Sequence, residues 1–107
     1  MVGATNEEVI KHLRTLKARL ADRYYVRRFI LFGSRARNKE LLTSDADVIV
    51  VSDDFKDIKF RRRPELVLEH WPDIVDLEVL CYTQDEFAQM RNRIGIVANA
   101  AADGIDL

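Results

Sequence analysis

The sequence has few of the residues that mark disulfide scaffolds, linkers and membrane spans. Its one cysteine, Cys81, lies in an apolar run, which excludes a disulfide framework and predicts a buried, inert thiol in a reducing compartment. Four glycines and two prolines argue against a disordered or linker-rich chain. No apolar stretch approaches the roughly 20 residues that cross a bilayer, and residues 1–6 lack the order of a secretory signal. We therefore expect a cytoplasmic protein that makes no contact with a membrane.

Length and charge place further bounds on the chain. Its 107 residues have the size of one ordinary domain, which predicts a single domain over residues 1–107. The net charge of −1 hides an asymmetry, because ten basic residues and one acid lie between Lys11 and Lys39. From Glu40 onward, acids outnumber basic residues by 15 to 7. The basic segment is suited to attract phosphates or an acidic partner, although a solvated helix face explains it as well.

Hydrophobic periodicity predicts a small mixed sheet packed with helices, an α+β fold. Strands are expected where β-branched and aromatic residues cluster, at residues 26–32, 46–51 and 74–81. Helices are expected at residues 6–24, in a short form within 34–42, within 55–71, and at 83–101. Thr5 with Glu8 and Thr83 with Glu86 have the capping-box spacing, and Gly95 is expected to dent the last helix. The arginine run at residues 61–63 is expected to be a solvated loop.

A glycine and a serine, Gly33 and Ser34, stand where a strand is expected to end and a helix to begin. Such a corner brings together backbone N–H groups without partners, a hydroxyl and no obstructing side chain, which are what phosphate oxygens require. It is therefore a candidate anion cradle. Taken alone, the pair is far more typical of a plain turn.

Two aspartates, Asp45 and Asp47, lie at the start of the next strand. Because strand side chains alternate, both project from the same face. Two adjacent like charges need a proton or a cation, and an all-oxygen site favours Mg²⁺. The alternative is a solvated turn in which one aspartate is a cap.

A third carboxylate is available on the last expected strand, where Asp76 and Glu78 share a face. Asp76 is the better candidate, because it sits within the apolar stretch, where an unpaired charge is costly. Glu78 is more easily solvated. The alternative for Asp76 is an exposed acid on an edge strand.

Together these segments resemble a known signature. Gly33-Ser34, ten intervening residues and then Asp45-Ala46-Asp47 resemble the motif of the DNA polymerase β-like nucleotidyltransferase superfamily, and most closely its minimal nucleotidyltransferase family. The resemblance extends to residues 35–37 and 75–77 and covers nearly the whole chain. Asn38 departs from the glycine usual in the family, which affects the loop and leaves the acids untouched.

The resemblance implies an activity and roles for these residues. Asp45, Asp47 and Asp76 would be the catalytic residues and would hold Mg²⁺, in two ions, with Asp76 completing the metal site or accepting the proton of the attacking hydroxyl. ATP is implied as the substrate by family likeness alone. The residues implied to bind its phosphates are Gly33, Ser34, Arg35 and Arg37.

The resemblance also implies a partner. Larger relatives carry an extra domain for the acceptor, so a second chain is expected to supply it here, typically a helical HEPN-family protein that acts as an RNase toxin. This chain would then be the antitoxin and would transfer AMP to a tyrosine of the toxin. No nucleic-acid-binding signature is present, and direct binding to nucleic acid is not expected. Two alternatives remain open: a non-catalytic antitoxin that acts by binding alone, and an enzyme of the aminoglycoside nucleotidyltransferase type.

Overall fold

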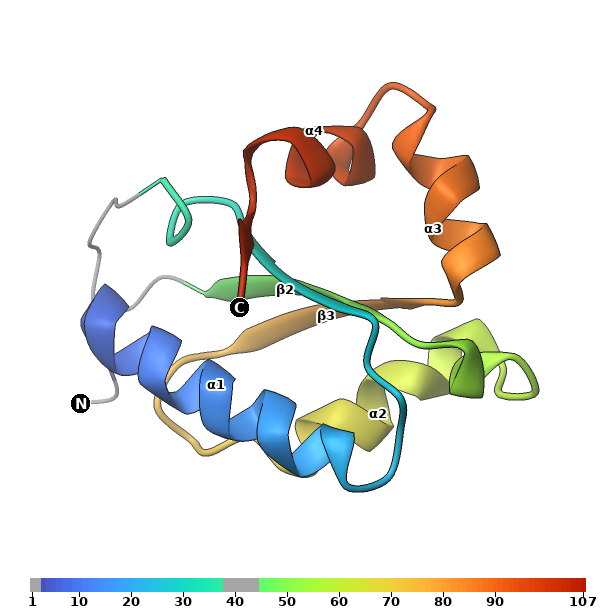
Figure 1. Ribbon diagram of the computed structural model, residues 1–107. Coiled ribbons are helices and arrows are strands. Elements are labelled where there is room, and N and C mark those ends of the chain that lie inside the picture. Colours follow the sequence, from blue (N-terminus) through green and yellow to red (C-terminus); the bar gives the residue numbers. More distant parts are fainter. Residues whose placement is uncertain (1–2, 38–44) are drawn as a thin grey trace.

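A mixed sheet lies between two layers of helices in the computed structural model, which describes residues 3–37 and 45–107. Helices α1 (Asn6–Ala21) and α2 (Arg63–Leu68) cover one face of the sheet, and α3 (Gln84–Arg91) and α4 (Ile96–Asp103) cover the other (Figure 1). This arrangement confirms the predicted α+β fold class. Within the described residues, no helix is long and apolar enough to cross a membrane.

The sheet has the strand order β3-β2-β1-β4 in the described residues. Its strands are β1 (Arg28–Phe32), β2 (Ala46–Val51), β3 (Leu77–Tyr82) and β4 (Ile105–Asp106). β1 runs antiparallel to β2 and β4, whereas β2 and β3 are parallel. In this register Phe32 lies opposite Asp47, and Asp47 lies opposite Glu78. Three residues from three strands therefore form one row across the sheet.

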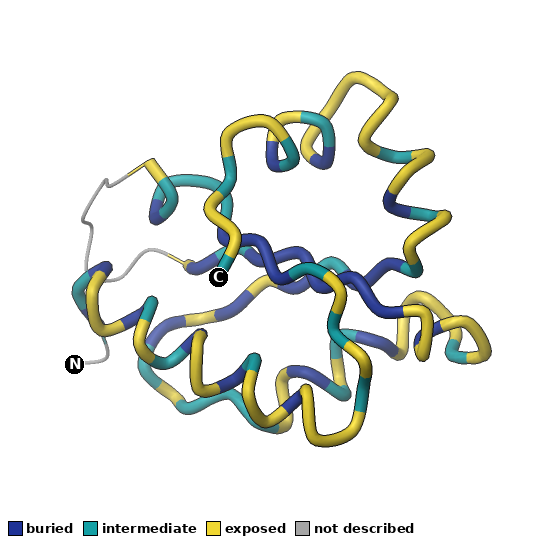
Figure 2. The backbone as a smooth tube through the Cα atoms, viewed as in Figure 1, coloured by how far each residue is buried: buried dark blue, intermediate teal, exposed yellow. Residues whose placement is uncertain are grey.

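The hydrophobic core lies on both faces of β2, which is why its sequence is an almost unbroken apolar run (Figure 2). Val48 and Val50 pack toward α1 and α2, and Ile49 and Val51 pack toward α3 and α4. The apolar stripe of α1 is buried as its 3.6-residue period predicts: Val9, Leu13, Leu16 and Leu20. Cys81 is fully buried, and burial raises its thiol pKa to about 12, in keeping with the inert thiol expected.

The C-terminal segment departs from the predicted single helix. Thr83 and Glu86 form the expected capping box, but α3 ends at Arg91 and α4 begins after Gly95. Gly95 has φ +143°, a conformation that only glycine adopts readily, so it breaks the helix rather than denting it. The break turns α4 back over the sheet. The short strand β4, which the sequence did not predict, then pairs with β1.

The other differences concern the ends of elements and the arginine run. α1 ends at Ala21 rather than residue 24, and the expected strands 26–32 and 74–81 begin two and three residues later, at Arg28 and Leu77. Residues 34–37 form a turn, and the rest of the expected helix at 34–42 lies outside the described residues. The solvated loop predicted for 61–63 was wrong for Arg63, which is only 3% exposed.

Candidate active site

The corner after β1 is built around a glycine that no other residue can replace without strain. Gly33 has φ +75°, in the left-handed region. A Cβ atom added there would lie 2.5 Å from Oδ2 of Asp47, well inside van der Waals contact. Conformation and space therefore both require glycine. As a result, the backbone of the corner approaches the Asp47 carboxylate directly.

Three carboxylates lie close to this corner. The Asp47 side chain makes a hydrogen bond with Glu78, its neighbour on β3, and also feels the charge of Asp45. Burial, followed by the hydrogen bond and charge of Glu78 and the charge of Asp45, together raise the pKa of Asp47 to about 6. The chain thus concentrates negative charge at this end of the sheet.

The donor set matches a hard divalent cation. All three groups offer carboxylate oxygens, which Mg²⁺ prefers, and Mg²⁺ needs only one or two of them besides substrate phosphates. Within residues 3–37 and 45–107, no three His, Cys, Asp or Glu side chains are placed closely enough to hold a metal by themselves. The Asp47–Glu78 pair with the open Gly33 corner therefore fits an ion that takes its remaining ligands from a nucleotide and water.

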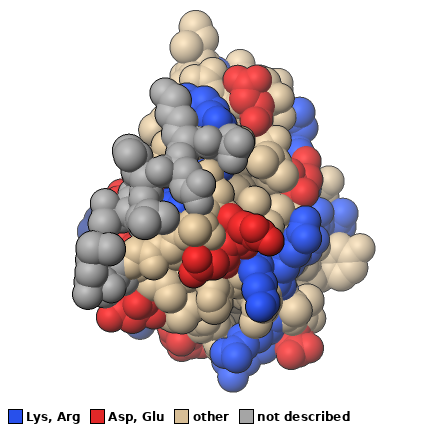
Figure 3. All heavy atoms as spheres, turned by 90° about the vertical axis from the view of Figure 1, so that its left-hand side faces the viewer, with Lys and Arg blue, Asp and Glu red and all other residues tan. Residues whose placement is uncertain are grey.

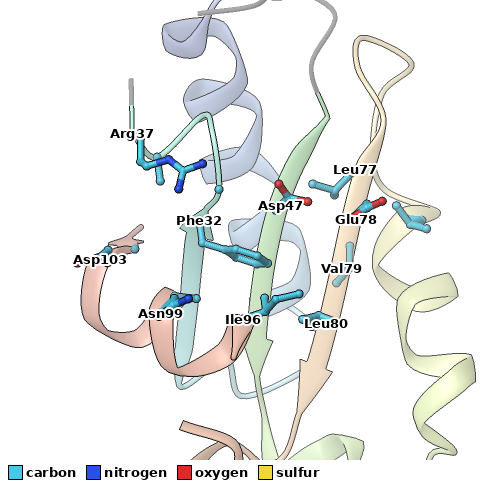
Figure 4. A pocket seen from close by; sticks show the side chains of 15 residues that line it. Phe32, Arg37, Asp47, Leu77, Glu78, Val79, Leu80, Ile96, Asn99 and Asp103 are labelled. Atoms are coloured by element: carbon cyan, nitrogen blue, oxygen red, sulfur yellow. The ribbon is translucent and has the colours of Figure 1, made fainter. Parts of the chain in front are cut away.

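A cavity of about 710 Å³ opens beside these carboxylates. Figure 4 shows Phe32, Asp47 and Glu78 facing it from the sheet, and Ile96 and Asn99 facing it from α4. Its wall is mainly apolar and includes a few charged and amide side chains, which is the usual character of a ligand pocket. The volume lies within the range of ligand-binding pockets.

The four residues expected to bind phosphate are placed differently from one another. Gly33 and Arg37 line the cavity, and Arg37 is exposed. Ser34 is half-buried in the turn that follows Gly33 and is not among the cavity's lining residues. Arg35 is 2% exposed and donates to the backbone oxygen of Ala4 at 2.6 Å and to Oδ1 of Asn6 at 3.0 Å.

Arg35 and Arg37 therefore have different surroundings. Arg35 holds the first turn of α1 against the corner, and Arg37 faces the cavity. Phosphate contacts by Ser34 and Arg35 therefore stay predictions, and the placement of Arg35 gives them no support.

The two candidates for the third carboxylate, Asp76 and Glu78, are both exposed and are placed differently. Asp76 is exposed and precedes β3, and its backbone oxygen accepts from the N–H of Ala46 at 2.9 Å. Glu78 instead contacts Asp47 and lines the cavity. Sequence reasoning preferred Asp76, because both acids share a strand face and only the register between β2 and β3 distinguishes them. A metal-binding role for Asp76 stays a prediction.

Acidic and basic side chains meet on one face of the molecule. On the face drawn in Figure 3, acidic and basic side chains lie next to one another. Ion pairs also join the basic segment to the acidic remainder of the sequence, for example Arg27 with Asp53 and Arg28 with Asp106. Part of the basic segment is thus neutralised within the chain.

Comparisons with known proteins identify the domain and its fold. A family model of the nucleotidyltransferase domain matches residues 13–98. A Sulfolobus solfataricus protein assigned as a nucleotidyltransferase, with a crystal structure at 1.40 Å resolution, superposes with a TM-score of 0.61 and 24% identity, covering 94% of this chain and 82% of the other. At that identity the likeness supports the fold alone. No curated protein matches the sequence.

The matched range contains the Gly33 corner, β2 and β3, and so every carboxylate described above. Domains of this kind generally use a nucleoside triphosphate and a divalent metal ion, which suits the donor set beside the cavity. Because the family model spans most of its length, the chain belongs to the nucleotidyltransferase domain family, and its chemistry is nucleotidyl transfer.

Proposed function

We propose that this protein transfers AMP from ATP, with Mg²⁺, to a hydroxyl group on a partner protein, and that it acts in this way as the antitoxin of a HEPN-type RNase toxin. The observation that carries the catalytic part is the group of Asp45, Asp47 and Glu78 near the Gly33 corner, where Asp47 and Glu78 line a cavity of about 710 Å³. ATP, the toxin and the protein acceptor rest on the resemblance to minimal nucleotidyltransferases.

The acidic residues hold the metal in this proposal. Asp47 and Glu78, with Asp45 next to them, supply the carboxylate oxygens, and we assign the third position to Glu78 rather than Asp76 because Glu78 contacts Asp47. When bound, Mg²⁺ supplies positive charge that stabilises both the entering and the leaving oxygen atoms. The carboxylates also offer an acceptor for the proton that the attacking hydroxyl releases.

The corner and Arg37 orient the triphosphate. The open backbone at Gly33 lets phosphate oxygens approach without meeting a side chain, and Arg37 adds positive charge at the cavity. The acceptor oxygen forms a bond to the α-phosphorus, the bond between the α- and β-phosphates breaks, and pyrophosphate leaves. In-line geometry requires the acceptor to enter opposite the pyrophosphate.

The decisive experiment uses intact-mass spectrometry. The protein is incubated with its HEPN partner, ATP and Mg²⁺, and we expect the partner to gain the mass of AMP. Asp45→Asn combined with Asp47→Asn should abolish the gain and the neutralisation of the toxin. If the double variant still neutralises the toxin, the protein is a non-catalytic antitoxin. If wild-type protein modifies a small alcohol but no partner, it acts on small molecules.

A matched pair of variants tests the third carboxylate. Glu78→Gln should reduce transfer by about 10²–10³-fold, because it removes a group that contacts Asp47. Asp76→Asn, a change of the same kind two residues earlier, should reduce it by no more than about threefold, a range typical of surface changes. The opposite ranking of the two rates would restore Asp76 to the site.

A further inference from the structure

The outer edge of β3 has a row of backbone groups that face away from the sheet. The carbonyl of Asp76 accepts from Ala46, and that of Tyr82 accepts from Ser52, both at 2.9 Å, so even-numbered residues of this stretch bond toward β2. Backbone groups alternate along a strand, so the odd-numbered residues point outward. Because β3 is the terminal strand of the sheet, no strand within the described residues meets these groups.

Two side chains cap this edge and leave its middle open. Nε1 of Trp71 donates to the carbonyl of Val75 at 2.8 Å, and Nη1 of Arg63 donates to that of Cys81 at 3.1 Å. The carbonyls of Leu77 and Val79, between the two capped positions, receive no donor from the described part of the chain.

The exposed fractions along this edge are small. Val75, Leu77 and Val79 keep 6%, 7% and 8% of their surface accessible, whereas Cys81 has 0%. Val48, which packs on the same face from the inner strand β2, also has 0%. The side chains from Val75 to Val79 therefore pack slightly less completely than those of the inner strand.

The cavity of the candidate active site reaches this open edge. One side of the cavity is lined by Leu77 and Val79 of β3 and by Leu68 of α2. The other side is lined by Leu80 of β3 and Ile96 of α4. A cavity lined by both faces of an edge strand must pass around that edge. Figure 4 shows Val79 beside Glu78 on β3, with Asp47 on the neighbouring strand. The open edge and the carboxylates therefore belong to one continuous groove.

The charges that line the groove indicate which kind of peptide segment would bind in it. Asp47, Glu78 and Asp103 line it against one basic residue, Arg37, in the described part of the chain. Asp73 and Asp76 are exposed just before β3. A segment entering from that end meets negative charge, so its complement is a peptide that carries Lys or Arg.

We propose that the groove binds an extended, basic segment of the acceptor protein, which pairs with Leu77 and Val79 as an additional strand and brings a hydroxyl side chain to the carboxylates. This inference rests on the proposed function and names its substrate class. An added strand lies about 4.8 Å from β3, and its side chains alternate between faces. A residue paired beside Glu78 and turned toward α4 therefore places its hydroxyl next to the site.

Peptide binding tests this without any catalytic activity. The probe is a capped Lys-Val-Tyr-Val-Lys peptide, added at millimolar concentration to ¹⁵N-labelled protein and followed by NMR. We expect shifts and slower hydrogen exchange at the amides of Leu77 and Val79, and weaker binding of a Glu-flanked or backbone N-methylated peptide. Shifts absent from these two amides, or equal binding of the N-methylated peptide, would overturn the proposal. Protection that rises with protein concentration alone would assign the edge to a second copy.

Two variants of one residue sharpen the test. Val79→Pro removes an N–H that faces away from β2, where an edge strand tolerates proline, and should weaken peptide binding by about tenfold. Val79→Ala keeps the N–H and should weaken it by less than about twofold. Unchanged amide signals of β2 confirm folding of each variant, and equal losses in both would contradict strand pairing. Because no nucleotide is present, a failure of AMP transfer would leave this result unaffected.

Discussion

The two ends of β3 differ in whether their charged side chains have a partner of opposite charge. At its beginning, Glu78 lies against Asp47, which also interacts with the charge of Asp45, and none of the three forms an ion pair with a basic side chain of the described residues. Beyond its other end, Arg63 and Glu86 form an ion pair of 2.6 Å. One end of the strand thus holds charge that the described chain leaves uncompensated, and the other holds charge that it compensates.

The compensated end is a structural network centred on Arg63. Its guanidinium donates to the backbone oxygens of Ile58 and Cys81 as well as to Glu86, and it lies over the rings of Phe55 and Phe60. These contacts tie α2 and the preceding loop to β3 and α3. The comparison teaches that burial of a charge does not by itself indicate a functional site. The presence or absence of an internal counter-charge distinguishes the two ends.

Breaking the compensated end should have the largest effect on stability. Arg63→Met keeps apolar volume beside the two phenylalanines but removes the donors to Ile58, Cys81 and Glu86. We expect the free energy of unfolding to fall by about 3 kcal/mol, measured by urea denaturation. The control is Arg23→Met, which removes an exposed ion pair of 3.9 Å and should cost no more than about 0.5 kcal/mol. Equal losses of stability in the two variants would mean that the buried hydrogen bonds of Arg63 do not stabilise the fold more than an exposed ion pair does.

Neutralising the uncompensated end should remove activity while sparing stability. Asp47→Asn should lower the rate of nucleotidyl transfer by about 10²–10³-fold, because a metal-binding oxygen is lost. Without metal, its melting temperature at pH 7 should equal or exceed that of the wild type, because a repelled charge is gone. Added Mg²⁺ should raise the melting temperature of the wild type alone.

Asp57→Asn, at an exposed position outside the cavity of the candidate active site, is the control for this change and should leave the rate and the Mg²⁺ response unaltered. A marked loss of metal-free stability in Asp47→Asn would show that the carboxylate is structural.

Alanine substitutions at the two glycines with positive φ distinguish backbone strain from a steric clash of the new side chain. Gly33→Ala and Gly95→Ala should each lower the free energy of unfolding by about 1–2 kcal/mol, because alanine adopts neither conformation readily. The new Cβ at Gly33 meets Asp47, whereas the one at Gly95 meets no atom within 4 Å. Calorimetric titration with Mg²⁺ should therefore show weaker binding for Gly33→Ala alone. Weakening by both variants would point to a general loss of structure.

In metal-free protein, lowering the pH should change the stability contributions of Asp47 and Glu86 in opposite directions. The pKa of Asp47 is raised from 3.8 to about 6, so the folded state holds its proton more tightly, and stability should decrease as the pH rises from about 4 to about 6. The pKa of Glu86 is lowered by the Arg63 hydrogen bond, so its contribution is present above the ordinary value of 4.5 and is lost as the pH falls.

Denaturation at stepped pH should separate these two contributions. Asp47→Asn should remove the decline between pH 4 and 6, and Glu86→Gln should remove the loss at lower pH. An unchanged profile in either variant would contradict the corresponding assignment.

Local sequence predicted the parts of the fold that depend on local chemistry. β2 was predicted with its observed bounds, because a strand buried on both faces must be apolar throughout. The Thr5 and Thr83 caps followed from side-chain hydrogen bonds within three residues. Gly33 and Asp47 were found because both belong to short motifs, and the structure places them in direct approach.

The rest depends on contacts between distant residues. Strand alternation puts Asp76 and Glu78 on one face, and only pairing with β2, some thirty residues earlier, places Glu78 opposite Asp47. The role of Asp76 stays a prediction. Arg35 was expected to face phosphate, since nothing in its neighbours signals a bond to Ala4 and Asn6. Burial of Arg63 depends likewise on Glu86, far along the chain.

The Arg35 contacts connect the start of the described chain to the corner beside the candidate active site. The guanidinium joins Ala4 and Asn6 to the turn that leaves Gly33, so the N-terminal segment acts as a brace for the corner. A shortened protein that starts at Glu7 would keep every carboxylate and most of α1, yet it would leave that buried guanidinium without two of its acceptors. Positioning of the triphosphate would then suffer from a deletion that touches none of the residues around it.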